Sequence, residues 1–389
     1  MRLYYFLTFF LVLTHFFTPL HAASSPRIIT DKLDRPWSLA FLPNGDFLVT
    51  ERGGQLRQVS STGNISFPIT GLPNITAVGQ GGLLDVVLHP DFETNHWVYV
   101  SYVAGSAVQG YSTEVIRGVL TLSHESETQS VNGGHLNDVK KLFVALPKTK
   151  GSRHFGGRLL LAKQRGQTYL FLSLGDRGVK SLSQNLNNHH GSLIRLHDNG
   201  DTPTDNPFVN TRGALPEIYS YGHRNIQGLA LHPNTNAIWL HEHGPQGGDE
   251  LNRIQAGRNY GWPVVTYGVN YGIATTIGEG THKVGMEQPH YMWDPSIAPS
   301  GLAFYKDKWL VGALKYQLLS VLTPLSHVTS AASTLKNNGS TPQLIQRFKE
   351  NRYFSQQFGR IRDVRIKGNK LYLLTDSGQG KLIQLPANF

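Results

Sequence analysis

The chain has 389 residues, of which 39% are hydrophobic and 16% are charged, so it suits one large folded domain or two ordinary ones rather than a disordered chain. It contains no Cys, which excludes disulfide frameworks, thiolate metal sites, iron–sulfur clusters and thiol nucleophiles. The formal net charge of +10 suits an anionic ligand or surface, and no nucleic-acid-binding motif occurs, so we expect no nucleic-acid partner.

The N-terminal segment is typical of a secretory signal peptide. After Arg2, residues 3–20 form an apolar stretch, and small residues follow it. A transmembrane anchor is the alternative, but a His and a Pro interrupt the stretch and no basic residue directly follows it. We therefore predict that residues 1–22 are a signal peptide. Residues 23–389 would then be periplasmic or secreted, without a membrane span.

The rest of the chain repeats one pattern, a hairpin of two alternating apolar runs joined by a turn containing Gly, Pro, Asn or Asp. A hairpin is only marginally stable alone, so similar hairpins that recur about every 65 residues indicate a shared core. This spacing suits blades of four antiparallel strands, and the sequence predicts an all-β, six-bladed β-propeller as a single domain. Stacked sandwiches are the alternative. The hairpins lie at 37–50, 83–100, 157–172, 227–240, 300–312 and 361–374.

Polar loops flank the third hairpin on both sides. His154 precedes its first strand, and Asp176 follows its second strand. Because a hairpin brings its two ends together, we expect the imidazole and the carboxylate to meet. A carboxylate bonded to one ring nitrogen fixes the tautomer and makes the other nitrogen a better base. A purely structural role is the alternative, since the chain contains 17 His.

The fourth hairpin carries a dense polar cluster. His241 and His243 have strand spacing and suggest zinc, but no third ligand has convincing spacing. The loop Gly244–Glu250 suits a hard cation better, because a tight turn exposes carbonyl oxygens while Asp249 and Glu250 add negative charge. A turn with only a structural role is the alternative.

Several cations lie near the ends of the predicted blades. Arg360 and Arg362 alternate on a predicted strand and so share one face, while Arg224 and Lys315 follow other strands. Such a ring suits a multiply anionic ligand, because Arg binds carboxylates in a bidentate fork. The chain has no Gly-rich nucleotide fingerprint, phosphate loop or Ser nucleophile elbow, which disfavours nicotinamide and ATP enzymes.

Taken together, these motifs resemble those of the soluble quinoprotein glucose/sorbosone dehydrogenases, and most closely the shorter bacterial aldose sugar dehydrogenases. The resemblance runs from about Arg35 to Leu385. The segments that carry it are Arg35–Trp37, Gly79–Leu83, Arg153–Arg158, Leu174–Asp176, Gly222–Asn225, Gly244–Glu250, Asn259–Pro263 and Arg360–Val364.

The resemblance implies an enzyme that oxidises the anomeric C1 hydroxyl of an aldose to a lactone, with hydride transfer to pyrroloquinoline quinone (PQQ). It implies His154 as the general base, Asp176 as the group that orients it, and Arg224 together with Ca²⁺ as the groups that polarise the quinone oxygen. Reduced PQQ would pass its electrons to an exported acceptor, a cytochrome or a quinone. The protein would be a monomer or a homodimer.

The resemblance also implies ligands for both cofactors. Gly244 and Pro245 would offer carbonyl oxygens to the Ca²⁺ that binds PQQ, and Glu250 with the Tyr260 carbonyl would bind a second, structural Ca²⁺. PQQ carries three carboxylates, which accounts for the basic ring. The residues implied to hold it are Gln80, Arg224, Asn225, Tyr271, Ala313, Leu314, Lys315, Arg360, Ile361 and Arg362.

Two other functions fit a propeller of this composition. One is a calcium-dependent lactonase or esterase, which would hold its metal through side-chain carboxylates and Asn. The other is a non-catalytic propeller that binds glycans or proteins, in which His154 and Asp176 would serve only stability. Fold alone does not separate the three, since propellers host many chemistries.

Overall fold

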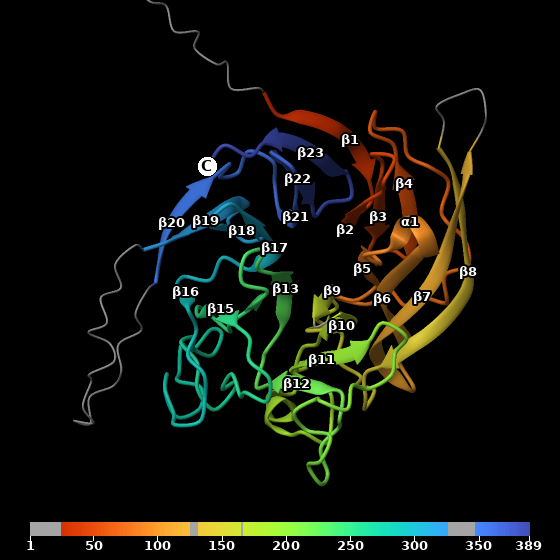
Figure 1. The fold of residues 1–389 in the computed structure, drawn as a ribbon. Coiled ribbons are helices and arrows are strands. Elements are labelled where there is room, and N and C mark those ends of the chain that lie inside the picture. The colour runs from red at the N-terminus through yellow and green to blue at the C-terminus, as the bar shows by residue number, and fades with distance from the viewer. Residues whose placement is uncertain (1–24, 125–130, 165, 326–346) are drawn as a thin grey trace, which may run out of the picture.

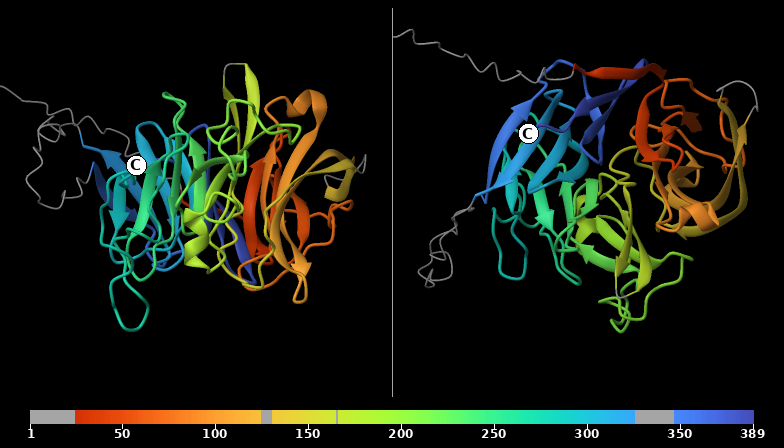
Figure 2. Two further views of the ribbon diagram at one scale, coloured as in Figure 1. Left: turned by 90° about the horizontal axis from the view of Figure 1, so that it is seen from below. Right: turned by 45° about the horizontal axis from the view of Figure 1, so that its top comes forward.

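The computed structural model describes residues 25–124, 131–164, 166–325 and 347–389, and the predicted signal peptide lies outside them. The strands form six antiparallel sheets arranged around one axis, as Figure 1 shows in a view down that axis and Figure 2 from the side. The predicted six-bladed β-propeller is therefore confirmed. Among the described residues, no helix is long and apolar enough to cross a membrane.

Each blade begins with an inner strand at the axis, and in the first five blades the later strands follow outward in chain order. All six predicted hairpins are present as the first two strands of a blade. Blades one to three contain β2 (Pro36–Phe41), β3 (Phe47–Glu51) and β4 (Gln55–Val59); β5 (Leu83–Leu88), β6 (Trp97–Ser106), β7 (Gly110–His124) and β8 (Val131–Val144); and β9 (Leu159–Gln164), β10 (Gln167–Ser173), β11 (Ser192–His197) and β12 (Ile218–Tyr221).

The other three blades follow the same plan. They contain β13 (Ile226–Leu231), β14 (Ile238–Glu242), β15 (Asp249–Arg253) and β16 (Tyr291–Trp293); β17 (Pro299–Tyr305), β18 (Lys308–Ala313), β19 (Leu318–Pro324) and β20 (Phe348–Tyr353); and β21 (Ile361–Lys367), β22 (Lys370–Thr375), β23 (Gly380–Pro386) and β1 (Arg27–Leu33). In the described part of the chain the helices are a single turn, α1 (Phe92–Asn95), and a 3-10 turn, η1 (Lys180–Gln184).

The last blade closes the ring because its outermost strand comes from the start of the chain. Strand β1 pairs antiparallel with β23, with Arg27 opposite Gln384 and Ile28 opposite Ile383. Figure 1 shows β1 alongside β23 at the outer edge of this blade. Closure of this kind joins the two ends of the chain in one blade and so holds the ring of blades together.

The first blade departs from the expected four strands. Its sheet contains β2, β3 and β4, and the chain beyond β4 is irregular. This segment still hydrogen bonds to the outer edge of β4, with the amides of Ser66 and Ile69 donating to the carbonyls of Gln58 and Leu56 at 2.9 Å and 2.8 Å. Pro68 lies between them and has no N–H to donate, so a regular ladder does not form here.

Apolar faces of neighbouring blades pack on one another. Between the fourth and fifth blades, the rings of Trp239 and Trp309 lie 5.1 Å apart in an edge-to-face arrangement, and Phe348 packs on both. Each fully buried side chain of this size contributes about 1.5–3 kcal/mol. The blades therefore form a rigid frame, and the loops at one end of the channel are held at fixed positions.

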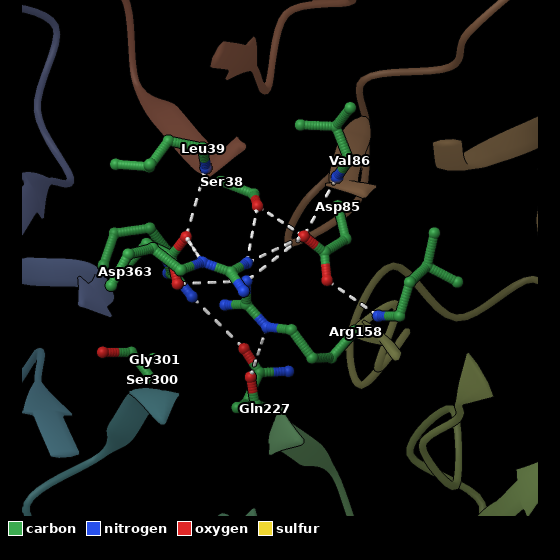
Figure 3. A network of polar contacts seen from close by, with 12 residues as sticks. Ser38, Leu39, Asp85, Val86, Arg158, Gln227, Ser300, Gly301 and Asp363 are labelled. Carbon is green, nitrogen blue, oxygen red and sulfur yellow. Dashed lines mark hydrogen bonds and ion pairs between the residues drawn. The ribbon is translucent and has the colours of Figure 1, made fainter. Parts of the chain in front are cut away.

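A buried charge network lies at the axis and is formed by the inner strands (Figure 3). Arg158 Nη1 lies 3.4 Å from Asp85 Oδ1 and 3.2 Å from Asp363 Oδ1. Arg365 completes the set, with Nη2 3.3 Å from Asp85 Oδ1 and Nε 2.9 Å from Asp363 Oδ2. Two guanidinium groups thus balance two carboxylates: Asp85 lies on β5, Asp363 and Arg365 lie on β21, and Arg158 directly precedes β9. Ser38 of β2 donates a further hydrogen bond to Asp85.

Candidate active site

The predicted contact at the third hairpin is present. His154 precedes β9 and Asp176 follows β10, and antiparallel pairing of these strands, with Leu159 opposite Leu172, brings both residues to one end of the blade. His154 Nδ1 and Asp176 Oδ1 lie 2.6 Å apart. The side chain of Asp176 is 1% exposed and that of His154 is 11% exposed, so the pair is shielded while the imidazole still reaches the surface of a cavity.

Local backbone geometry holds His154 in place. Its φ is +55°, a left-handed conformation that costs a residue with a side chain about 1–2 kcal/mol. The amide of His154 donates to Gln80 Oε1 at 2.7 Å, which helps to stabilise this conformation. Gly175 passes so close that a Cβ there would lie 2.3 Å from the carbonyl oxygen of His154. A larger residue at 175 would therefore displace the histidine.

Both carboxylate oxygens of Asp176 accept strong hydrogen bonds. Oδ1 accepts from His154 Nδ1 and from the amide of Gly178 at 2.7 Å, and Oδ2 accepts from the indole Nε1–H of Trp262 at 2.8 Å. Burial alone would raise the pKa of Asp176, but His154, the Gly178 amide and the charge of Arg224 together lower that pKa below its usual 3.8. Asp176 is therefore ionised at neutral pH.

His154 is neutral at the same pH. Burial lowers its pKa below 6.5, and the nearby charges of Arg224 and Arg153 act in the same direction, which outweighs the raising effect of Asp176. A neutral imidazole that donates from Nδ1 to an ionised carboxylate carries its lone pair on Nε2. Nε2 is thus the atom that can accept a proton from a ligand.

A cavity of about 480 Å³ opens beside this pair. His154 and Asp176 line it together with Arg224, Pro245 and Tyr271, all of which the sequence had predicted as site residues. Among the other lining residues, none of which had a predicted role, are the polar and aromatic side chains of Trp262, Lys180, Arg153 and Asn270. Three of the lining side chains are cationic and Asp176 carries the one carboxylate, so the cavity favours an anionic ligand.

The predicted pair Arg360 and Arg362 lies outside the lining of this cavity but converges on one carboxylate. Their Nη2 atoms lie 3.1 Å and 3.4 Å from Asp376 Oδ2, and together the two arginines keep the pKa of Asp376 low despite its burial. Arg362 also donates to Gln227 Oε1 at 3.2 Å, and Gln227 Nε2 donates to Asn225 Oδ1 at 3.2 Å. Asp376 had not been predicted as part of the basic ring.

The remaining predicted cofactor residues differ in how they face solvent. Gln80 and Lys315 are exposed and Asn225 is buried. Ala313, Leu314 and Ile361 have buried side chains, so backbone atoms are the groups that these three offer to a ligand. The carbonyl of Leu314 already accepts a hydrogen bond from Arg360 Nη1 at 3.4 Å.

The predicted cation loop is tightly built. The amide of Gly244 donates to Asp249 Oδ1 at 2.8 Å, and Asp249 Oδ2 accepts from the amide of Ala298 at 2.8 Å, so this carboxylate holds the loop together. The carbonyl of Pro245 faces the cavity side, where the hydroxyl of Tyr271 donates to it at 2.8 Å. Within the described part of the chain, no three His, Asp or Glu side chains gather as a metal site.

Glu250 and Tyr260 lie next to a second buried polar cluster. Burial and the charge of neighbouring Glu242 raise the pKa of Glu250 to about 8. Asn252 Nδ2 donates to Glu250 Oε2 at 3.1 Å and to Glu242 Oε1 at 3.4 Å. His223 bonds to Glu242 at 2.7 Å and stacks on the ring of Tyr260. Without a cation Glu250 therefore carries a proton at neutral pH, and a bound cation could take the place of that proton.

Comparison with known proteins places the chain beside one family of dehydrogenases. The pattern of the Glucose / Sorbosone dehydrogenase family matches residues 33–384. Aldose sugar dehydrogenase YliI of Escherichia coli (strain K12) is 39% identical over 375 residues, which are 94% of this chain and 93% of that protein.

Solved structures give the same result. The soluble aldose sugar dehydrogenase from Escherichia coli in the apo-form superposes with a TM-score of 0.82 at 38% identity, covering 94% of this chain and 99% of that one. The PQQ-bound form of aldose sugar dehydrogenase from Streptomyces coelicolor has a TM-score of 0.72 at 26% identity, covering 92% of this chain and 96% of that one.

Proposed function

Because the chain belongs to the glucose/sorbosone dehydrogenase family of oxidoreductases, we propose that it is a PQQ-dependent aldose sugar dehydrogenase that oxidises the anomeric hydroxyl of aldoses to lactones. The observation that carries the proposal is the His154–Asp176 pair, which reaches an electropositive cavity with Nε2 as its proton acceptor. A sugar hydroxyl needs such a base when hydride leaves the same carbon.

The residues present fit PQQ as a ligand. Its three carboxylates require cationic partners, and Arg153, Lys180 and Arg224 line the cavity, while Lys315, Arg360 and Arg362 lie nearer the fifth and sixth blades. When bound, PQQ supplies a two-electron acceptor for the hydride of the substrate. The protein supplies orientation, charge and a proton acceptor.

Proton transfer is the role of the His154–Asp176 pair. Nε2 of His154 takes the proton of the anomeric hydroxyl, and the imidazolium that forms is stabilised by Asp176 at 2.6 Å. Asp176 also fixes the tautomer in advance, so no reorientation is needed during the reaction. The pKa of His154, lowered by burial and Arg224, keeps the base unprotonated and ready at neutral pH.

Stabilisation of developing negative charge is the role of Arg224. Its Nη1 donates to the carbonyl of His243 at 3.2 Å, and its Cζ lies 5.3 Å from the centre of the Trp262 ring, so the guanidinium is held in one position. Its side chain lines the cavity beside His154. A fixed cation in a partly shielded site stabilises an oxyanion without reorganisation of solvent.

We further propose that Ca²⁺ binds at the two predicted places. Carbonyl oxygens of Gly244 and Pro245 suit a hard cation next to the cavity, and Glu250 with the Tyr260 carbonyl suits a structural one. The position of Glu242 directly opposite Glu250 on β14 and β15 supports the second site, because a divalent cation would balance both carboxylates. The N-terminal apolar segment supports export to the periplasm or medium, with a cytochrome or quinone as electron acceptor.

The proposal is tested by reconstituting purified residues 23–389 with neither cofactor, with either one, or with both PQQ and Ca²⁺. Dye reduction is then followed with a panel of aldoses, and the product is identified by NMR. We expect activity that requires PQQ, reaches its maximum with both cofactors, and yields the lactone. Lactone hydrolysis without PQQ, or the absence of both PQQ binding and sugar oxidation, would overturn the proposal.

A further inference from the structure

The indole of Trp262 occupies an unusual position between the cations of the cavity and the carboxylate beneath His154. Its Nε1–H donates to Asp176 Oδ2 at 2.8 Å, while Arg224 Cζ and Lys180 Nζ lie 5.3 Å and 5.8 Å from its ring centre. The side chain is 5% exposed. An indole N–H can only donate, so this bond has one polarity.

The backbone around Trp262 fixes the ring at this position. Its amide donates to the carbonyl of Gly222 at 2.8 Å, and its own carbonyl accepts from Gln184 Nε2 at 2.8 Å. Gln184 belongs to η1 of the third blade, and Gly222 follows β12 of the same blade. The indole therefore reaches Asp176 from a loop of the fourth blade that is anchored to the third.

We propose that Trp262 is a positioning residue that acts on His154 through Asp176, holding Oδ2 of the carboxylate and thereby moderating the bond of Oδ1 to the imidazole. Without the indole donor, Asp176 Oδ2 would lose its partner in a buried setting. When a carboxylate loses one of its hydrogen-bond donors, its negative charge is less neutralised, and it attracts the remaining donors more strongly. The inference rests on the proposed role of His154 as base, but the hydrogen-bond chain itself is independent of any cofactor.

Removal of the indole N–H therefore has a definite direction of effect. The groups that face His154 are Asp176, Arg224 and Arg153, with Lys180 across the cavity. Of these, Asp176 alone favours the imidazolium. Because Trp262→Phe leaves the three cations and strengthens the pull of Asp176, it should raise the pKa of His154.

The test is NMR titration of the His154 ring in cofactor-free protein, in which ¹⁵N shifts also report the tautomer. We expect Trp262→Phe to raise the pKa of His154, and to have no such effect in an Asp176→Asn background, where no carboxylate remains to act. Trp309→Phe is the matched control. Trp309 is also 5% exposed, and its indole nitrogen has no hydrogen-bond partner in the described structure, so its loss changes packing alone.

A second variant keeps the test possible if Trp262→Phe does not fold. Benzothienylalanine at position 262 replaces the N–H by sulfur while keeping the shape of the ring, and it should give the same shift. An unchanged pKa and tautomer of His154 in a folded variant would overturn the proposal. If the pKa shifts but the acid limb of sugar oxidation by the loaded enzyme does not, then the role of His154 as base is wrong and the positioning by Trp262 stands.

Discussion

His154 Nδ1 and Asp176 Oδ1 lie 2.6 Å apart at the two ends of one hairpin, with the indole of Trp262 on the other carboxylate oxygen. Paired strands β9 and β10 of the rigid propeller hold the backbones of both residues in place, and the cavity opens on the imidazole. The arrangement leads to the following expectations.

The rate of sugar oxidation should decrease as the pH is lowered below neutral. The base must be unprotonated, and burial, Arg224 and Arg153 lower the pKa of His154 below 6.5. Turnover should therefore be constant near pH 7 and decrease as pH falls through the lowered pKa, with a midpoint below 6.5. Arg224→Gln removes one lowering charge and should move this midpoint upward. A midpoint above pH 7 in the wild type would contradict the assignment of His154 as the base.

Stability should also fall in acid, for a related reason. Burial lowers the pKa of His190 to about 4, of His290 to about 4 and of His241 to about 3. Below pH 6.5 the unfolded chain binds protons at these histidines and the folded chain does not, so the unfolded state is favoured as pH falls. Each histidine contributes a slope of about 1.4 kcal/mol per pH unit between 6.5 and its folded pKa. Urea unfolding at pH 7.5 and pH 5 measures this loss, and equal stabilities would contradict it.

Much of this architecture could be predicted from the sequence. Alternating apolar residues, such as those of 37–50, predict a hairpin without any knowledge of the strands that pack beside it. Six such hairpins at similar spacing predict a ring of six blades. The contact of His154 with Asp176 could also be predicted locally, because the antiparallel pairing of a hairpin brings the start of its first strand next to the end of its second. Closure of the ring by β1 could not be foreseen in this way, because its partner β23 lies more than 300 residues away.

The sequence pattern also could not predict which residues of different blades contact one another. Trp262 stands in a recognisable motif, but its bond to Asp176 spans 86 residues and depends on how two blades pack. Asp376 was missed because the basic residues around Arg360 suggested a purely cationic ring. The axial network was not predicted because Asp85 and Asp363 resemble ordinary polar positions within apolar strands.

The axial network should be essential for stability. Asp85→Asn leaves Arg158 and Arg365 buried with one carboxylate fewer, and breaking a buried pair in this way costs about 3–5 kcal/mol. Asp307→Asn is the control, because Asp307 pairs with Lys308 at the surface, where such a pair contributes about 1 kcal/mol or less. Denaturant unfolding of both variants measures the difference. Equal effects would show that the network contributes little.

Calcium should stabilise the protein through Glu250. If Glu250 binds the structural cation, Ca²⁺ at about 100 times its dissociation constant should add about 2.7 kcal/mol, and Glu250→Gln should abolish this increment. Glu279→Gln serves as the control, since Glu279 is exposed and pairs only with Lys283 in the described structure. Thermal unfolding with and without chelator gives the answer. A calcium effect that survives Glu250→Gln would place the cation elsewhere.

The central claim is that His154 accepts the proton while hydride leaves C1 of the sugar. The most direct measurement is stopped-flow reduction of PQQ in the loaded protein by glucose and by [1-²H]glucose, for the wild type and His154→Gln. We predict a primary isotope effect in the wild type and a rate about 10²–10⁴ lower in the variant, with PQQ still bound. An unchanged rate in His154→Gln, or no reduction of bound PQQ by any aldose, would contradict the account.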